Sequence, residues 1–203
     1  MIAILNYGVG NVFSLECSLR YIGEQSVLTA DPAVIEKADR MILPGVGAFG
    51  DAAVLLRKSG LDAVLKKQVQ AGKPLLGICL GMQLLYQNSC EYGLHEGLGL
   101  VKGSIRSLAE DLASPVYKVP QMGWNSLEQH APCLLLSELK SGEMVYFVHS
   151  FYAPVTADTV ASAEYGGVQV TGVVQSGNVY GMQFHPEKSG EVGLRMLKAF
   201  AKV

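Results

Sequence analysis

The sequence predicts an α/β protein whose sheet is mostly parallel and doubly wound. In the first half, short apolar runs alternate with stretches of helical periodicity, which is the pattern of a parallel sheet covered by helices. The apolar runs are continuous, as is typical of strands that are buried on both faces. The second half instead holds short runs rich in Val, Tyr and Phe, so antiparallel strands are expected there.

The first strand is expected at residues 2–5, where "IAIL" is apolar throughout. A glycine turn, "YGVGN", leads into a helix over 12–22 whose apolar residues recur three and four positions apart. Gly23 is placed to end that helix. A second strand is expected at 26–30, followed by a short helix over 31–38 that an Asp-Pro pair opens.

The third strand is expected at 40–43 and is followed by the turn "PGVG". The next helical stretch, 52–73, contains Gly60, so a break is expected there. The fourth strand lies at 74–78, and the apolar pattern of "GMQLLYQN" predicts a helix over 81–88 directly after it.

The rest of the chain is expected to form short strands separated by Gly, Pro and Asn, several of them antiparallel. An amphipathic helix over 190–203 closes the sequence. No internal repeat, low-complexity tract or linker divides the sequence, so we expect one domain over 1–203 built on a mixed sheet.

The composition argues against several classes of function. The 203 residues carry a formal net charge of -2 without a cluster of Lys and Arg, which disfavours nucleic acid or a membrane surface as partner. No apolar run approaches the roughly 20 residues of a membrane-spanning helix, and the N-terminal run lacks the basic flank of a signal peptide.

The cysteines are Cys17, Cys79, Cys90 and Cys133. Because they are scattered and show no spacing typical of a metal site, we expect a reduced, cytoplasmic protein with no bound metal or cofactor.

The segment "GICLG" at 77–81 places Cys79 between an expected strand and an expected helix. Glycines two residues before and after it fit the tight strand-to-helix turn that holds a nucleophile in α/β enzymes. Such a turn would aim the sulfur above the carboxyl edge of the sheet, at a helix N-terminus that favours the thiolate. The N–H of Leu80 would then donate to an oxyanion. The alternative is a buried cysteine whose neighbouring glycines serve only packing.

In "QFHPEKS", His185 directly follows an apolar run, with Glu187 two residues on. An extended His-Pro-Glu places both side chains on the same side of the backbone, so the carboxylate can orient the imidazole toward the cysteine. The alternative is an exposed pair in a turn.

His149 in "YFVHSFY" is the rival base, but no carboxylate lies near it, and a place in an interface or pocket is favoured. His95 and His130 have no assignable role.

The segment "GVGAFG" at 45–50 matches the glycine fingerprint of dinucleotide-binding folds. We set this interpretation aside because Pro44 precedes the glycines and no acidic residue ends a strand about 20 positions later. Instead, Gly45, Val46 and Gly47 are expected to present a backbone N–H to the nucleophile as a second oxyanion donor. A purely structural turn is the alternative.

Three of these segments, "LLGICLGMQLL", "QFHPEKS" and "LPGVG", resemble the class I glutamine amidotransferases. Within that family, "LNYGVGN", "VPQMGWN" and "YFVHSFY" are similar to the glutaminase subunits that serve imidazole glycerol phosphate synthase in histidine biosynthesis. The resemblance runs from the first strand to the last helix. It implies a flavodoxin-like fold and an enzyme that hydrolyses glutamine to glutamate and ammonia through a cysteine thioester.

The resemblance also implies roles for individual residues. Cys79 would be the nucleophile, His185 the general base and acid, and Glu187 the group that orients the imidazole. Gln83 and Glu91 would contact the bound glutamine, the latter at its α-amino group.

The family further implies a (β/α)8-barrel synthase subunit that forms a heterodimer with the chain and receives ammonia through an internal channel. This partner would make imidazole glycerol phosphate and aminoimidazole carboxamide ribonucleotide. The residues expected to face it are Pro120, Met122, Trp124, Tyr146, His149 and Lys188. For Trp124, a place in the core is the alternative.

Two other functions stay open at this point. One is a glutaminase subunit for another acceptor, such as anthranilate, aminodeoxychorismate or pyridoxal-phosphate synthase. The other is a non-catalytic glutamine-binding scaffold, which the intact set of Cys, His and Glu disfavours.

Overall fold

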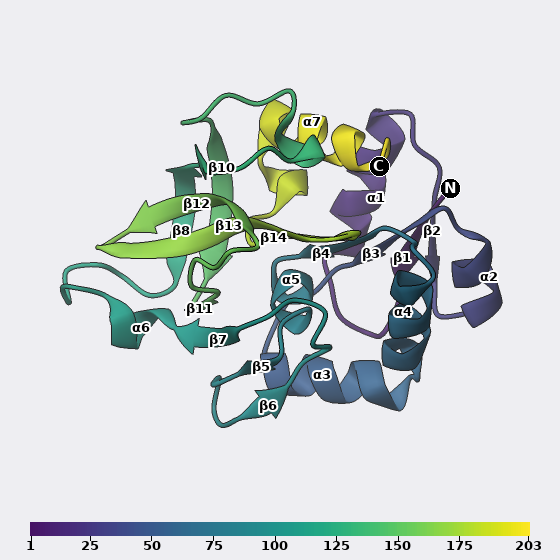
Figure 1. The fold of residues 1–203 in the computed structure, drawn as a ribbon, viewed down its shortest axis with the longest axis horizontal. Coiled ribbons are helices and arrows are strands. Elements are labelled where there is room, and N and C mark those ends of the chain that lie inside the picture. Colours follow the sequence, from purple (N-terminus) through teal and green to yellow (C-terminus); the bar gives the residue numbers. More distant parts are fainter.

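The computed structural model describes residues 1–203 and is built on an eight-stranded mixed sheet (Figure 1). In spatial order its strands are β2 (Ser26–Thr29), β1 (Ile2–Leu5), β3 (Arg40–Leu43), β4 (Leu75–Ile78), β14 (Val179–Met182), β13 (Val168–Ser176), β12 (Thr159–Tyr165) and β9 (Glu128–Gln129). Neighbouring strands are parallel from β2 to β14 and antiparallel from β14 to β9. This arrangement confirms the predicted α/β class and the antiparallel extension from the second half.

Helices cover both faces of the sheet (Figure 1). One face carries α2 (Pro32–Lys37), α3 (Phe49–Lys58), α4 (Leu61–Gln70) and α5 (Leu80–Leu84), and the other carries α1 (Val12–Tyr21) and α7 (Gly190–Phe200). Alternate residues of one strand therefore enter different cores: Ala3 of β1 belongs to the first and Ile4 to the second. This is why β1 and β4 are apolar and buried throughout.

The structure confirms one predicted helix boundary and differs from another. The break at Gly60 is confirmed, because this residue adopts a left-handed conformation (φ 72°) between α3 and α4. The helix expected over 81–88 is shorter, since α5 ends at Leu84. The carbonyls of residues 84–87 accept hydrogen bonds from the N–H groups of residues 97–101. These tertiary bonds replace the ones that would have continued the helix.

The chain from residue 88 onward also forms two small sheets that the sequence analysis did not separate from the main one. Strands β8 (Gln121–Ser126) and β10 (Met144–His149) form an antiparallel pair. The other sheet has the order β11 (Phe151–Tyr152), β7 (Ser104–Ser107), β5 (Asn88–Ser89) and β6 (His95–Glu96). Three short helical segments complete the fold: α6 (Leu108–Asp111), η1 (Leu134–Leu136) and η2 (Pro186–Lys188).

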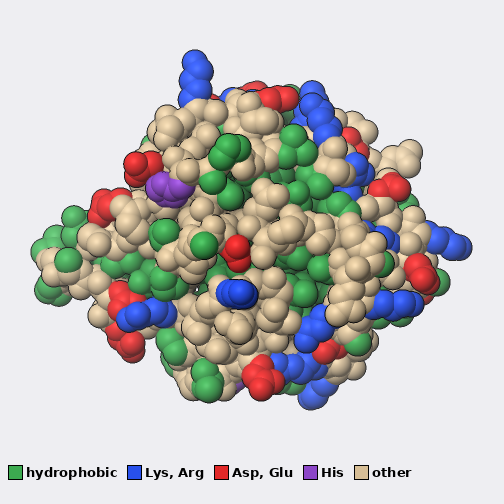
Figure 2. Space-filling view, viewed as in Figure 1, with side chains coloured by type: hydrophobic (Ala, Val, Ile, Leu, Met, Phe, Trp, Pro, Cys, Tyr) green, Lys and Arg blue, Asp and Glu red, His purple; other side chains and the backbone are tan.

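On the face seen in Figure 2, acidic and basic side chains are interspersed. None of the helices has the length and apolar character required to cross a bilayer.

The parallel strands deliver several chemically useful residues to one edge of the sheet. Tyr7 lies just beyond β1, Pro44 follows β3, Cys79 follows β4, and His185 lies three residues beyond β14. Because parallel strands end at the same edge, and open α/β sheets bind ligands there, this edge is the place to look for a site.

Candidate active site

The turn between β4 and α5 holds Cys79 in a strained conformation. Its φ of 53° and ψ of -113° lie outside the regions that L-residues ordinarily occupy. A Cβ at Gly77 would lie 2.6 Å from the carbonyl oxygen of Gly81, and a Cβ at Gly81 would overlap the carbonyl of Leu43. Both flanking glycines are thus sterically required, as the sequence analysis expected of a nucleophile turn.

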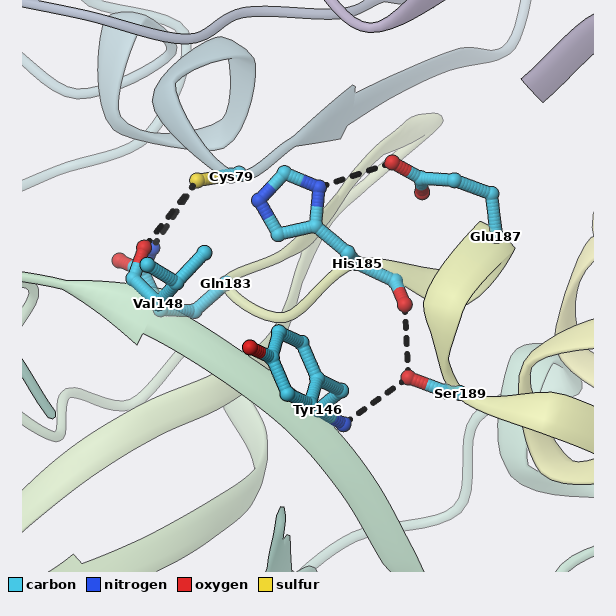
Figure 3. Close-up of polar contacts among 7 residues, drawn as sticks. All are labelled: Cys79, Tyr146, Val148, Gln183, His185, Glu187 and Ser189. Carbon is cyan, nitrogen blue, oxygen red and sulfur yellow. Dashed lines mark hydrogen bonds and ion pairs between the residues drawn. The ribbon is translucent and has the colours of Figure 1, made fainter. Parts of the chain in front are cut away.

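A histidine and a glutamate lie beside this turn, 106 and 108 residues further along the chain. Nδ1 of His185 donates to Oε1 of Glu187 across 2.8 Å, and both side chains are buried. Figure 3 shows the other ring nitrogen turned toward the sulfur of Cys79. The backbone is fixed as well, because the hydroxyl of Ser189 donates to the His185 carbonyl at 2.7 Å and accepts from the Tyr146 N–H at 3.0 Å (Figure 3).

The charge of His185 is set by competing effects. Burial disfavours the charged ring, but hydrogen bonds to Cys79 and Glu187, together with the negative charges of these groups, raise its pKa to about 10. The ring is therefore an imidazolium at neutral pH. An imidazolium beside a cysteine sulfur is the arrangement that activates catalytic cysteines.

His149 has the opposite character. Burial lowers its pKa to about 4, and the positive charge on His185 acts in the same direction. The hydrogen bond from its Nδ1 to the Phe151 carbonyl at 3.0 Å acts in the opposite direction but is the weaker effect. It is neutral at pH 7, and its unprotonated Nε2 has no hydrogen-bond partner. His149 was expected to line an interface or a pocket, and its buried side chain lines the cavity beside Cys79.

The cavity at this edge has a volume of about 400 Å³, within the range of ligand pockets. It brings together most of the expected site residues. Those that line it are Val46, Gly47, Cys79, Leu80, Gln83, Glu91, Pro120, His149, His185 and Lys188. Gly45 lies against the nucleophile turn, because a Cβ there would be 2.8 Å from the N–H nitrogen of Gly81. The backbone of the Gly45–Gly47 segment and that of Leu80 are therefore neighbours.

One amide and one carboxylate in this cavity can accept hydrogen bonds from a ligand. The amide nitrogen of Gln83 donates to the Phe151 carbonyl at 2.8 Å and to Oε1 of Gln183 at 3.0 Å, which leaves its own oxygen as an acceptor. Glu91 is buried, and its Oε2 accepts from the N–H of Phe49 at 2.6 Å. Acceptors of this kind suit an ammonium group.

Gln183 is a residue whose role the sequence analysis missed. It is fully buried, and its amide nitrogen lies 4.0 Å from the sulfur of Cys79. Figure 3 shows Gln183 beside Cys79. Its side-chain oxygen also accepts a hydrogen bond from Gln83, so one amide links the nucleophile to the ligand cavity. The signal was present in "QFHPEKS", since extended backbone places residues two positions apart on the same side, here Gln183 and His185.

The remaining residues of the expected partner surface lie on or near the β8–β10 pair. Pro120, Met122, Trp124 and Lys188 are exposed, and Tyr146 is half-buried. The ring of Trp124 meets that of Tyr146 edge-on at 6.1 Å, and the Lys188 ammonium lies 5.9 Å from the Tyr146 ring. Trp124 is 54% exposed, so the alternative of a core aromatic is wrong.

The other histidines and cysteines lie outside the cavity. His95 packs against Gly50, and His130 hydrogen bonds to Ser162 through Nε2 at 2.7 Å. None of the four cysteines forms a disulfide. No group of three or more His, Cys, Asp or Glu side chains is placed to hold a metal ion.

A cysteine sulfur beside an imidazolium that can donate a proton, with backbone N–H groups next to it, has the parts needed for acyl transfer through a thioester. Residues 3–203 match the family described as glutamine amidotransferase class-I, and the chain belongs to this family.

Several curated relatives within this family are the same subunit of one enzyme. The imidazole glycerol phosphate synthase subunit HisH of Bacillus cereus (strain G9842) is 48% identical over 203 residues, which span 100% of this chain and 95% of that protein. The same subunit of Oceanobacillus iheyensis is 48% identical over 206 residues, covering 100% and 99%. That of Listeria monocytogenes serotype 4a is 44% identical over 203 residues, covering 100% and 96%.

Solved structures agree with the fold. A structure titled "Crystal structure of glutamine amidotransferase" has a TM-score of 0.74 at 20% identity, covering 99% of this chain and 97% of the other. PurLQS from Thermotoga maritima has a TM-score of 0.74 at 22% identity, with the same coverage. These likenesses confirm the expected arrangement of a mostly parallel, flavodoxin-like sheet with helices on both faces.

Proposed function

We infer that the chain is the glutamine amidotransferase subunit of an imidazole glycerol phosphate synthase and acts in histidine biosynthesis. The names and full-length similarity of the curated relatives support this function. The observation that carries the chemistry is the approach of buried His185 to Cys79 in a cavity of amino-acid size, with Glu187 behind the ring. We propose that residues 1–203 act as one glutaminase domain in the cytoplasm.

The proposed reaction begins with a bound glutamine whose α-ammonium group lies at Glu91 and the Gln83 oxygen. The thiolate of Cys79 attacks the δ-amide carbon and forms a tetrahedral oxyanion. The N–H of Leu80 and those of the Gly45–Gly47 segment donate to that oxygen. His185 then gives its proton to the amide nitrogen, the carbon–nitrogen bond breaks, and ammonia leaves a γ-glutamyl thioester on the sulfur.

The second half of the reaction reverses the proton's direction. His185, now neutral, removes a proton from a water molecule, and the resulting hydroxide attacks the thioester carbon. The thiolate leaves, and the products are glutamate and the original thiolate–imidazolium pair. Glu187 keeps the ring oriented in both halves and holds its charge.

We further propose that ammonia passes to a (β/α)8-barrel synthase subunit in a heterodimer. Pro120 and Lys188 support this proposal because they line the cavity and are exposed, so they lie between the nucleophile and the molecular surface. Met122 and Trp124 continue the same region as exposed apolar side chains, of the kind found in interface cores.

The test uses the chain reconstituted with the barrel subunit of its own organism. Replacement Cys79→Ala should abolish product formation from glutamine while leaving product formation from added ammonia unchanged. Cys133→Ala, which removes a thiol outside the cavity, should change neither the reaction with glutamine nor the reaction with added ammonia. Retention of the glutamine-dependent reaction in Cys79→Ala would refute the assignment of the nucleophile.

A further inference from the structure

The residues between β3 and α3 form a segment whose conformation secondary structure does not fix. We call residues 45–48 the oxyanion segment. None of its four N–H groups donates to another backbone group. Val46 at its middle is 40% exposed. The position of these N–H groups therefore depends on what holds the two ends of the segment.

The first end is held by a buried phenol from the loop after β1. The hydroxyl of Tyr7 donates to the carbonyl of Pro44 at 2.6 Å, and the side chain is 5% exposed. The same hydroxyl also leaves no room for a side chain at the next residue, because a Cβ at Gly45 would lie 2.9 Å from the Tyr7 oxygen. Burial, and then the negative charge of Cys79, raise the pKa of Tyr7, so the phenol stays a donor throughout the neutral range.

The second end is held by a carboxylate from a different part of the chain. Oε2 of Glu91 accepts from the N–H of Phe49, the first residue of α3, at 2.6 Å. The ring of His95 lies against the next residue, since a Cβ at Gly50 would be 2.8 Å from its Cε1. The start of α3 is thus held by residues 91–95, and Glu91 also lines the ligand cavity.

We propose that Tyr7 and Glu91 are positioning residues that hold the two ends of the oxyanion segment, so that its N–H groups face the carbonyl oxygen of a substrate at Cys79. This proposal rests on the function proposed above. The two tethers differ in one respect, because Tyr7 does not line the cavity whereas Glu91 does. Loss of the Tyr7 hydroxyl should therefore affect the rate of acylation without affecting glutamine binding.

The experiment compares two reactions of the same sulfur in the full chain, saturated with its synthase subunit. Formation of the γ-glutamyl thioester passes through an oxyanion, whereas alkylation by iodoacetamide displaces iodide from a saturated carbon and does not. Both products are measured by mass spectrometry on the peptide that contains Cys79. In Tyr7→Phe, the rate of thioester formation should fall about 10- to 100-fold. This decrease is no larger than the roughly 100- to 1,000-fold decrease that follows removal of a whole oxyanion donor. The alkylation rate and the KM for glutamine should stay within about twofold.

Matched variants separate this effect from a general loss of structure. Tyr152→Phe removes the hydroxyl of an equally buried tyrosine, which donates to Asp111 at 2.8 Å outside the cavity, and should change neither reaction. Glu91→Gln should raise the KM for glutamine and slow acylation, whereas Asp31→Asn, which alters the carboxylate at the start of α2, should do neither.

Three results would be decisive. An equal fall of acylation and alkylation in Tyr7→Phe would overturn the proposal, because Tyr7 would then support the sulfur itself. An unchanged acylation rate would overturn it as well. If the wild-type chain forms no thioester at all, the proposed function fails, and that failure is visible before any variant is compared.

Discussion

His185 and Glu187 form an ion pair that solvent barely reaches, with Nδ1 and Oε1 2.8 Å apart and the side chains 4% and 3% exposed. The second carboxylate oxygen has no hydrogen-bond partner within the protein. The ring of His185 is therefore the only group of the protein that hydrogen bonds to the Glu187 carboxylate, and part of the raised pKa of His185 depends on that carboxylate.

Glu187→Gln tests this dependence. Without the carboxylate charge, the pKa of His185 should fall from its raised value, because one of the groups that stabilise the imidazolium is gone. We expect glutamine hydrolysis to slow about 10²- to 10⁴-fold, the range typical of a lost acid–base function. Steady-state kinetics and an NMR titration of the ring measure the two effects. A ring that titrates as before would contradict this account of the pair.

Stability should depend on pH in a direction fixed by the same ring. The folded-state pKa of about 10 lies above the unfolded value of 6.5, so between these values the native state holds a proton that the unfolded state releases. The contribution of His185 is thus complete below about pH 6.5 and is lost as pH rises toward 10. In urea denaturation, Glu187→Gln should show a smaller fall in the free energy of unfolding over this range than the wild type, because the hydrogen bond with Glu187 helps raise the pKa of His185 and both proteins keep the Cys79 thiol. Equal slopes in the two proteins would contradict the prediction.

Gln183→Met tests the amide that links the nucleophile to Gln83. This change keeps the volume but removes the donor 4.0 Å from the sulfur and the acceptor that holds the Gln83 amide. Because a hydrogen bond to a charged group contributes roughly 1.5–3 kcal/mol, we expect kcat/KM to fall about 10- to 100-fold. Gln68→Met alters a similarly buried glutamine of α4 and should leave kcat/KM unchanged. Equal effects of the two changes would show that only stability was lost.

His149→Asn distinguishes the two histidines of the cavity. Since His149 is neutral above about pH 5 and lacks a carboxylate partner, it is a poor proton donor at neutral pH. Its replacement should leave thioester labelling of Cys79 within a few-fold, while His185→Ala should nearly eliminate it. We expect His149→Asn instead to reduce the fraction of ammonia that reaches the synthase reaction, measured as product formed per glutamate released. Equal loss of labelling in both variants would make His149 the base.

The nucleophile turn and the His-Pro-Glu segment could be predicted from sequence because their geometry is local. At Cys79, the glycines at 77 and 81 are required by contacts within the turn and with the adjacent strand end. At His185, two-residue periodicity alone brings the ring and carboxylate to one side. The class of fold was also predictable, because apolar runs buried on both faces differ in pattern from the helices between them.

The surroundings of these residues could not be predicted in this way. The burial of His149 in the cavity wall depends on the pairing of β10 with β8, which the local sequence pattern does not show. Gln183 stood inside a recognised motif, but its contact with Gln83 joins residues 100 positions apart. Nothing in the local pattern indicates which buried amide will lie beside the sulfur.

The sequence by itself determined the alternation of strands and helices, the cysteine at the tight turn after β4 and the His-Glu pair proposed to serve it, since these follow from periodicity and short-range sterics. Only the tertiary structure decided the charges of His149 and His185 and the hydrogen bonds of Tyr7 and Glu91 at the two ends of the oxyanion segment. Burial and hydrogen bonding depend on which distant segments pack together, and that packing sets the desolvation and the partners of every group in the cavity.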